Sequence, residues 1–373
     1  MNNLPCRLLL SDGSRFEGFF FTSPHVRTGE VVFNTALTGY QEVVTDPSYT
    51  GQMVVMTYPM IGSYGVTPLD NESSKAHLRV LICKEYIPFY SNWRATQSLG
   101  EFLDDHQVVG ITGVDTRTLT RRLRDHGSLN GVVAPATHDW DRLADMIGAI
   151  PTMVGQNLTP LVTTPTPYRV VPSNALPTYR VAVIDTGVKR HILNELTQRG
   201  CSCDVFPVTA SVHDILGQFD GVMLANGPGD PEPVESVIHL IQQLLGKLPI
   251  FGICLGHQLL WLALGGQTYK LKFGHHAVNH PVRQLATGRV EITSQNHGFC
   301  IDIDSLPSDQ IELTHINLND HTPEGFRHRR YPAFSVQYHP ESAPGPHDST
   351  YLFDDFVNMM QQFRMKGFAN VVS

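Results

Sequence analysis

Hydrophobic residues in the first half of the chain fall in short runs rich in β-branched side chains, and loops separate these runs. The runs cover residues 7–10, 16–21, 31–33, 53–57, 80–83 and 108–111. The turn residues Asp12-Gly13 predict a β-hairpin from the first two runs. Residues 116–126 have leucines four apart after the capping residue Asp115, which predicts a helix. We therefore expect a mainly β or α+β domain in residues 1–165.

From residue 180 onward, apolar strands alternate with amphipathic helices. Strands are expected at 181–184, 204–208 and 222–225, and helices at 189–199 and 234–245. This alternation predicts an open α/β sheet that is at least partly parallel, in which ligands collect beyond the carboxyl ends of the strands. Residues 163–178 contain four prolines and little apolar periodicity. We interpret residues 166–179 as a linker and residues 180–373 as the second domain.

The stretch PIFGICLGHQLLWLAL, residues 249–264, places Cys254 between an apolar strand and an apolar helix. Gly252 and Gly256 flank the cysteine and remove the Cβ atoms that clash in a sharp strand-to-helix turn. This pattern is typical of a nucleophile elbow with sulfur in place of oxygen. The helix N-terminus favours a thiolate and a developing oxyanion. A free cysteine in an apolar run is often a small core residue, but the glycines and His257-Gln258 favour a nucleophile.

A candidate base appears in FSVQYHPE, residues 334–341. Residues two apart on an extended chain point the same way, so Glu341 can lie beside His339 and orient its ring. A lone His-Pro-Glu is usually a surface turn, and its significance here comes from pairing with Cys254. The loop at residues 226–231, NGPGDP, also follows a predicted strand. We expect this loop and Cys254 to meet at one edge of the sheet.

The composition and net charge exclude some classes of binding partner. The formal net charge is -8, with 27 Lys and Arg against 35 Asp and Glu, so we expect neither nucleic acid nor an anionic membrane as a partner. No apolar run approaches the roughly 20 residues of a membrane helix, and we expect a cytoplasmic protein with its six cysteines reduced. Cys201 and Cys203, and the histidines at 275, 276 and 280, lack the full ligand set of a zinc site. We therefore expect no metal.

These motifs together resemble the class I, or triad, glutamine amidotransferases. The second half has their Gly-Pro-Gly loop, the G-x-C-x-G-H-Q sequence and the final His-Pro-Glu. The first half carries VVFNTALTGYQEVVTDPSYTGQ (31–52) and GVDTRTLTRRLRDHGSLNG (113–131), which resemble the amino-terminal domain of carbamoyl-phosphate synthase small chains. SQNHGF (294–299) and HPESAPGPHD (339–348) extend the resemblance over nearly the whole chain.

The resemblance implies roles for individual residues. Cys254 would be the nucleophile, His339 its base and later the acid, and Glu341 the group that orients His339. The resemblance assigns the oxyanion hole to the backbone N–H groups of Gly227 and Leu255. The positions that would hold glutamine are Ser48, Gly227, Gly229, Leu255, Gln258, Asn296, Gly298 and Phe299. Because Ser48 lies in the first domain, the site is expected at a domain interface.

The resemblance also implies a reaction and a partner. L-Glutamine would be hydrolysed to glutamate and ammonia through a γ-glutamyl thioester, without a cofactor in this chain. Ammonia would pass to a large chain that makes carbamoyl phosphate from bicarbonate and ATP for arginine and pyrimidine synthesis. ATP and metal are expected on that large chain, in a heterodimer or a higher oligomer. Two departures from the family are Ala277-Val278, where glycines are usual, and Thr186, where relatives often have an aromatic residue.

Three other functions fit parts of the sequence. A freestanding γ-glutamyl hydrolase or cysteine peptidase would use the same triad but leaves the first domain unexplained. A binding subunit without activity conflicts with an intact Cys, His and Glu set. An amidotransferase subunit of another synthase, such as one for anthranilate or guanylate, would share only the second half. Residues 38–52 discriminate against this last alternative.

Overall fold

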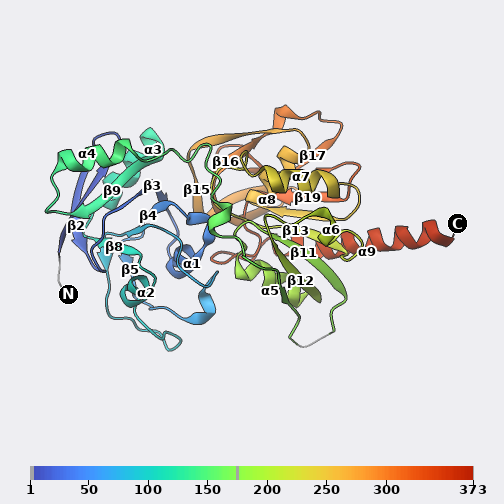
Figure 1. Cartoon of the computed structure of the whole chain (residues 1–373), viewed down its shortest axis with the longest axis horizontal. Coiled ribbons are helices and arrows are strands. Elements are labelled where there is room, and N and C mark those ends of the chain that lie inside the picture. The colour runs from blue at the N-terminus through green and yellow to red at the C-terminus, as the bar shows by residue number, and fades with distance from the viewer. Residues whose placement is uncertain (1–3, 174–175, 373) are drawn as a thin grey trace. The chain divides into compact units, whose positions relative to one another are not determined.

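The computed structural model describes residues 4–173 and 176–372 and divides the chain into two compact units (Figure 1). The first unit comprises Met1–Gln156 and Leu271–Ala277, and the second comprises Asn157–Lys270 and Val278–Ser373. The structure thus divides the chain at a different residue from the boundary predicted at residue 165. The functional division that we expected stays a prediction.

Seven strands of the first unit form a closed barrel in the order β1-β2-β8-β6-β4-β3-β9. Their bounds are β1 Pro5–Leu10, β2 Arg15–Phe20, β3 Arg27–Asn34, β4 Gln52–Met56, β6 Val80–Ile82, β8 Val109–Thr112 and β9 Leu129–Pro135. The antiparallel pairing of β1 with β2 confirms the predicted hairpin. Two short strands, β5 (Met60–Ile61) and β7 (Glu85–Tyr86), pair separately.

Alternating side chains along each barrel strand serve two different cores. Met53 and Val55 of β4 join the cluster that fills the barrel, whereas Val54 packs outward against α1 (Tyr40–Thr45) and α2 (Leu99–Asp105). This is the period of two that β-structure imposes. The other helices of the unit are α3 (Thr116–His126), α4 (Trp140–Gly148) and the 3-10 turns η1 (Pro47–Tyr49) and η2 (Pro68–Asp70).

Helix α3 begins and ends where the sequence predicted. The Asp115 carboxylate accepts a hydrogen bond from the Thr118 N–H at 3.0 Å, and Gly127 lies at the C-cap. Leu119 and Leu123 then join the cluster inside the barrel. The mainly β, α+β character expected of the first half is therefore confirmed.

The second unit contains a ten-stranded sheet in the order β10-β12-β11-β13-β14-β19-β18-β17-β15-β16. The bounds are β10 Tyr168–Val170, β11 Tyr179–Asp185, β12 Cys201–Pro207, β13 Gly221–Leu224, β14 Ile250–Ile253, β15 Gln267–Gln284, β16 Val290–Asp302, β17 Ile311–Asn317, β18 Pro323–His328 and β19 Ala333–Val336. Neighbours from β12 to β19 in this order run parallel, which confirms the open α/β sheet. β10 lies in the predicted linker and pairs antiparallel with β12 as an edge strand.

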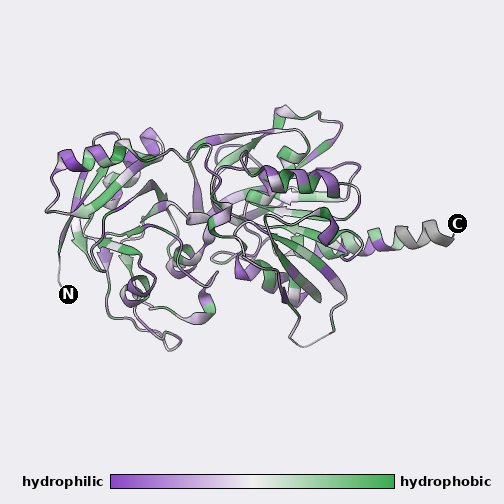
Figure 2. Cartoon of the chain, viewed as in Figure 1, coloured by the Kyte–Doolittle hydropathy of each residue, from purple (hydrophilic) through white to green (hydrophobic). Residues whose placement is uncertain are grey.

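Helices cover both faces of the parallel strands. Val181 and Val183 of β11 pack in one cluster with α5 (Arg190–Gln198) and α9 (Tyr351–Val372). Ala182 and Ile184 pack in another with α7 (Glu235–Leu244) and α8 (Leu255–Ala263). The short elements of this unit are α6 (Val212–Ile215), η3 (Thr159–Leu161) and η4 (Ile303–Ser305). Strands doubly covered in this way are apolar along their length, as the green of β11 and β13 shows in Figure 2.

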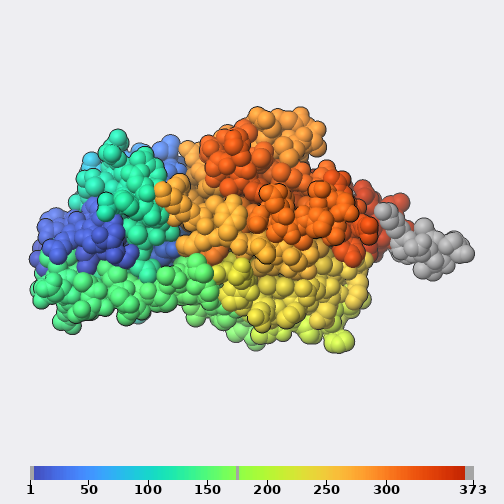
Figure 3. Space-filling view, turned by 90° about the horizontal axis from the view of Figure 1, so that it is seen from above, coloured from blue at the N-terminus to red at the C-terminus, as the bar shows by residue number. Residues whose placement is uncertain are grey.

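The described helices include none that is long and apolar enough to cross a membrane. All six cysteines are buried free thiols, in agreement with the expectation that they are reduced. In the space-filling view, the second unit's surface on the viewed side is formed mainly by yellow and orange segments from the second half of the chain (Figure 3).

The turn between β14 and α8 is closely packed. A Cβ atom on Gly252 would lie 2.6 Å from the Gly256 carbonyl oxygen, and one on Gly256 would lie 2.2 Å from the Leu224 carbonyl oxygen. Both neighbours are backbone atoms, which cannot rotate away. Only glycine therefore allows the first turn of α8 to approach β13 this closely.

We predict that Gly256→Ala lowers the free energy of unfolding by about 1–3 kcal/mol, because the added methyl group overpacks a rigid backbone contact. Chemical denaturation measures this change. Gly148→Ala is the matched control, since a Cβ atom at the end of α4 meets nothing within 4 Å. Equal stability of the two variants would contradict the close packing.

Candidate active site

Four polar side chains follow four neighbouring parallel strands. Lys189 follows β11, Asn226 follows β13, Cys254 follows β14 and His339 follows β19. Because these strands are parallel and adjacent, their carboxyl ends lie along one edge of the sheet. Ligand sites of open α/β sheets form at such edges.

Cys254 lies at the N-cap of α8 in a strained backbone conformation. Its φ is 54° and its ψ is -106°, a region that residues other than glycine rarely adopt. The Cys254 N–H donates to the Val336 carbonyl at 2.9 Å, and Sγ lies 3.5 Å from the Asn296 carbonyl oxygen. Strain of this kind persists where the surroundings enforce it and is common at active sites. These contacts hold the predicted elbow in place.

His339 and Glu341 lie together, as their spacing of two predicted. Nδ1 of His339 is 2.7 Å from Oε1 of Glu341, and each residue is only 1% exposed. The His339 N–H donates to the Ser294 carbonyl at 2.9 Å, which fixes the backbone. Within residues 4–173 and 176–372, Nε2 of His339 has no hydrogen-bond partner. This nitrogen is therefore available to exchange a proton with a neighbouring group.

Lys189 completes a buried chain of charges that the sequence analysis missed. Its ammonium lies 2.8 Å from Oε1 of Glu341 and also donates to the carbonyl of Ala343. The Lys189 side chain is 2% exposed. The sequence signal for Lys189 was its place at the expected start of the helix 189–199, in the connection that follows a strand expected to end at the ligand edge.

Charge interactions outweigh the effect of burial on the pKa values of His339 and Glu341. Burial lowers the pKa of His339, but the Glu341 carboxylate and the Cys254 thiol raise it to about 10. Burial raises the pKa of Glu341, but Lys189 and His339 bring it far below its usual range. Glu341 is consequently ionised at neutral pH. The His339 imidazole beside it is a stronger base than a free imidazole.

The two predicted oxyanion donors are Gly227, in the loop after β13, and Leu255, at the first position of α8. A Cβ atom on Gly227 would lie 2.1 Å from the Thr186 carbonyl oxygen and 2.8 Å from Cδ2 of Leu255, so this position requires glycine. The Thr186 hydroxyl lies 2.9 Å from the carbonyl oxygens of both Ala225 and Asn226. Thr186, one of the two departures noted in the sequence, thus supports the loop that carries Gly227.

The Gln258 side chain is held in one orientation. Nε2 donates to the Phe299 carbonyl at 2.8 Å and to Oε1 of Gln337 at 3.0 Å. Both amide hydrogens are therefore engaged, and Oε1 of Gln258 is the group left to accept a hydrogen bond from a ligand. At the preceding position of the helix, Nδ1 of His257 lies 2.9 Å from the Ser335 hydroxyl. These bonds tie the first turn of α8 to the strand that leads to His339, and sequence reasoning did not foresee Gln337.

The other residues that were predicted to bind glutamine lie in different surroundings. Asn296 contacts Cys254 through its carbonyl, and a Cβ atom on Gly298 would meet nothing within 4 Å, so open space adjoins it. Gly229 has a φ of 90° and forms a bridge with Asn157. Ser48 lies buried in η1 of the first unit. Its assignment to glutamine stays a prediction.

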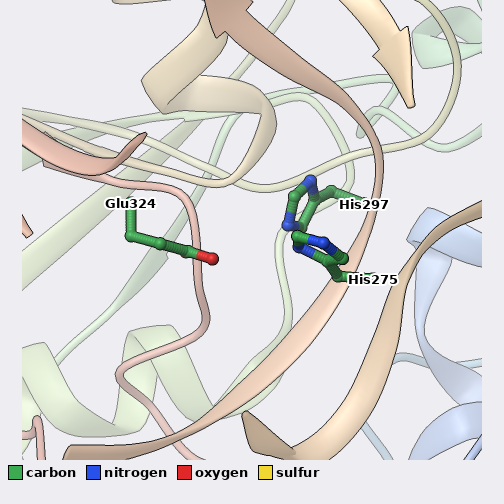
Figure 4. Close-up of side chains that lie close together, drawn as sticks. All are labelled: His275, His297 and Glu324. Atoms are coloured by element: carbon green, nitrogen blue, oxygen red, sulfur yellow. The ribbon is translucent and has the colours of Figure 1, made fainter. Parts of the chain in front are cut away.

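A buried polar network supports the strand that carries Asn296 and Gly298. Nε2 of His297 lies 3.0 Å from Oε1 of Gln295, whose amide donates to Glu324 at 3.0 Å. Figure 4 shows the side chains of His297 and Glu324. The expectation that the chain binds no metal stays a prediction. The departure at Ala277-Val278 lies within β15, where Ala277 is buried.

We predict that Lys189→Met lowers the free energy of unfolding at pH 7 by about 3 kcal/mol or more, because it leaves the Glu341 charge buried without its cation. The Glu341 pKa is lowered in the folded state, so its contribution to stability is present above its unfolded pKa and is lost as the pH falls. Without Lys189, this acid loss should begin at a higher pH. Urea denaturation across the pH range measures both effects.

Arg169→Met is the matched control, since it removes an ion pair with Asp204 in which the Arg169 side chain is 55% exposed. Asp204 keeps Arg180 as a second cation, so loss of the largely exposed Arg169 should cost at most about 1 kcal/mol. A Lys189 variant as stable as the Arg169 variant would show that the buried cation has no such role.

Comparisons with known proteins agree with this geometry. Residues 182–359 match the family described as glutamine amidotransferase class-I, and residues 8–133 match the carbamoyl-phosphate synthase small chain, CPSase domain. The chain is 50% identical to the carbamoyl phosphate synthase small chain of Syntrophotalea carbinolica, over 96% of this chain and 98% of that protein. It is also 50% identical to the one from Chlorobaculum tepidum, over 98% of this chain and 100% of that protein.

A crystal structure of a glutamine amidotransferase from Thermotoga maritima is 22% identical, with a TM-score of 0.36 over 43% of this chain and 76% of that chain. The two carbamoyl phosphate synthase small chains, by contrast, align with this chain over both of its halves. The chain therefore belongs to the carbamoyl phosphate synthase small chain family and carries a class I glutamine amidotransferase domain.

Proposed function

We propose that this chain hydrolyses L-glutamine to glutamate and ammonia through a Cys254, His339 and Glu341 triad. The observation that carries the proposal is the hydrogen bond between His339 and the ionised Glu341, beside a cysteine held at a strand-to-helix turn. A base oriented by a carboxylate and adjacent to a thiol is the arrangement that nucleophilic acyl transfer needs. Family membership identifies the acyl donor as glutamine.

In the first half-reaction, His339 already holds the proton of the Cys254 thiol, because its pKa is raised to about 10, and the Cys254 sulfur attacks the side-chain carbonyl carbon of glutamine. The developing oxyanion accepts hydrogen bonds from the N–H groups of Gly227 and Leu255. As the carbon–nitrogen bond breaks, the imidazolium of His339 gives its proton to the leaving nitrogen. The products are ammonia and a γ-glutamyl thioester on Cys254.

In the second half-reaction, His339 removes a proton from water as the water oxygen attacks the thioester carbon. The carbon–sulfur bond breaks, glutamate leaves, and His339 keeps the proton, as at the start of the first half-reaction. Glu341 stays ionised throughout and stabilises the imidazolium in both halves. These steps require no metal or organic cofactor in this chain.

Substrate binding uses the groups that the triad leaves available. We assign Oε1 of Gln258 as an acceptor for glutamine, because both of its amide hydrogens already bind Phe299 and Gln337. The open space beside Gly298 suits the substrate backbone. We also assign Ser48, Gly229 and Asn296 to glutamine, on the basis of the family resemblance.

The ammonia is proposed to pass to a large chain. Relatives are named small chains of carbamoyl phosphate synthase, which implies a large-chain partner. We propose that this partner binds ATP and metal and makes carbamoyl phosphate from bicarbonate, for arginine and pyrimidine synthesis. Glutamine-dependent carbamoyl phosphate formation after mixing the purified chains tests this coupling.

We predict that Cys254→Ser lowers glutamine hydrolysis by more than about 10³-fold, because an alcohol is a much weaker nucleophile than a thiol in this site. Ammonia release and trapping of the labelled thioester measure the loss. Cys201→Ser, which changes a buried thiol in β12, is the matched control and should keep wild-type activity. Near-normal hydrolysis by Cys254→Ser would refute the assignment.

We predict that His339→Asn removes more activity than Glu341→Gln, because the base contributes more than the group that orients it. Glu341→Gln should retain at least about tenfold more activity than His339→Asn. Steady-state ammonia release gives the order. Equal losses in the two variants would mean that the carboxylate does more than orient the imidazole.

A further inference from the structure

The loop between β7 and α2, residues 87–98, displays two aromatic side chains to solvent. Phe89 is 86% exposed and Trp93 is 92% exposed. Across the described part of the chain, the other exposed aromatic side chains are 43% exposed or less. Burial of large aromatic side chains is a main source of folding free energy, so nearly complete exposure of two on one loop is unusual.

This loop is tied to the unit rather than extended freely from it. Four backbone hydrogen bonds connect it to the segment that begins at β5: Ile87 N to Ile61 O (2.8 Å), Ser91 N to Ser63 O (3.0 Å), Thr96 N to Val66 O (2.9 Å) and Val66 N to Gln97 O (3.0 Å). Arg94 forms an ion pair with Asp70 of η2. The two aromatic side chains are thus presented on a backbone whose conformation is already ordered. Binding through them costs little additional conformational entropy.

We name Phe89, Trp93 and Leu69 the aromatic patch. Leu69 is 69% exposed, and its neighbour Asp70 carries the ion pair with Arg94. Phe and Trp side chains each bury about 150–250 Å² when covered. The two aromatic residues therefore supply roughly half of the 800 Å² that a stable interface needs on each partner. Such residues are also enriched among those that dominate binding energy.

We propose that the aromatic patch is a docking surface for the large chain, which covers Phe89 and Trp93 with an apolar recess. This inference rests on the proposed function, because the partner is the one that the small-chain family implies. The patch lies in the first unit, which contains none of the triad residues. The net charge of -8 on every copy disfavours self-association through this loop and disfavours an anionic lipid surface.

The test is the double variant Phe89→Ser/Trp93→Ser in the full chain. Its affinity for the purified large chain, measured by titration calorimetry, should fall at least about 100-fold, because two central aromatic contacts are lost. Glutamine hydrolysis by the isolated variant should stay within twofold of wild type, which also verifies that it folds. The control is Tyr168→Ser/Tyr331→Ser, two exposed aromatic residues of the second unit, which should bind the large chain normally.

Wild-type affinity of the patch variant for the large chain would overturn the proposal. A second outcome would also overturn it: the variant binds the large chain normally but no longer forms a dimer of this chain in sedimentation. The partner that covers the aromatic patch would then be a second copy of this chain. Failure of the proposed function has a different signature. In that case the wild-type chain would release no ammonia from glutamine, whatever the patch variant does to binding.

Discussion

The close approach of α8 to β13 and β14 is the constraint on which the candidate site depends. Backbone atoms of Leu224 and Gly256 lie where Cβ atoms of Gly256 and Gly252 would be, so the turn can form only with glycines. That turn places Cys254 at a positive φ and at the N-terminus of a helix. The thiol is thereby directed toward the edge of the sheet where the other strands also end. Packing of the core, rather than any contact of the thiol itself, sets this position.

The candidate site also depends on a buried set of charged groups formed by Lys189, Glu341 and His339. An isolated buried carboxylate would protonate, but Lys189 and His339 both contact Oε1 of Glu341 and keep it ionised. The retained negative charge then raises the pKa of His339 against the effect of burial. Lys189 thus contacts Glu341, which in turn contacts His339. The ionised state of Glu341 is explained only when Lys189 is included.

The two units differ in the side chains that they bury and in those that they expose to solvent. The second unit covers both faces of its sheet and buries the groups proposed for chemistry. The first unit closes its sheet into a barrel, which removes strand edges, yet displays two aromatic residues on an ordered loop. A barrel without triad residues and with an exposed aromatic patch suits a role in assembly. This division agrees with a family in which a small chain works beside a large one.

Local patterns in the sequence determined much of this description. The elbow at Cys254, helix α3 with its Asp115 cap, the βα alternation after residue 180 and the pairing of His339 with Glu341 all follow from spacing, capping and periodicity within a few residues. Local patterns did not predict the closure of the barrel, the order of the ten strands or the edge pairing of β10. They also did not predict the positions of Lys189 and Gln337. Each depends on hydrogen bonds or packing between segments far apart in the chain, such as those that carry Lys189 and Glu341, whose sequence numbers differ by 152. Only the tertiary structure brings such groups together, because no local pattern records which distant strand becomes a neighbour.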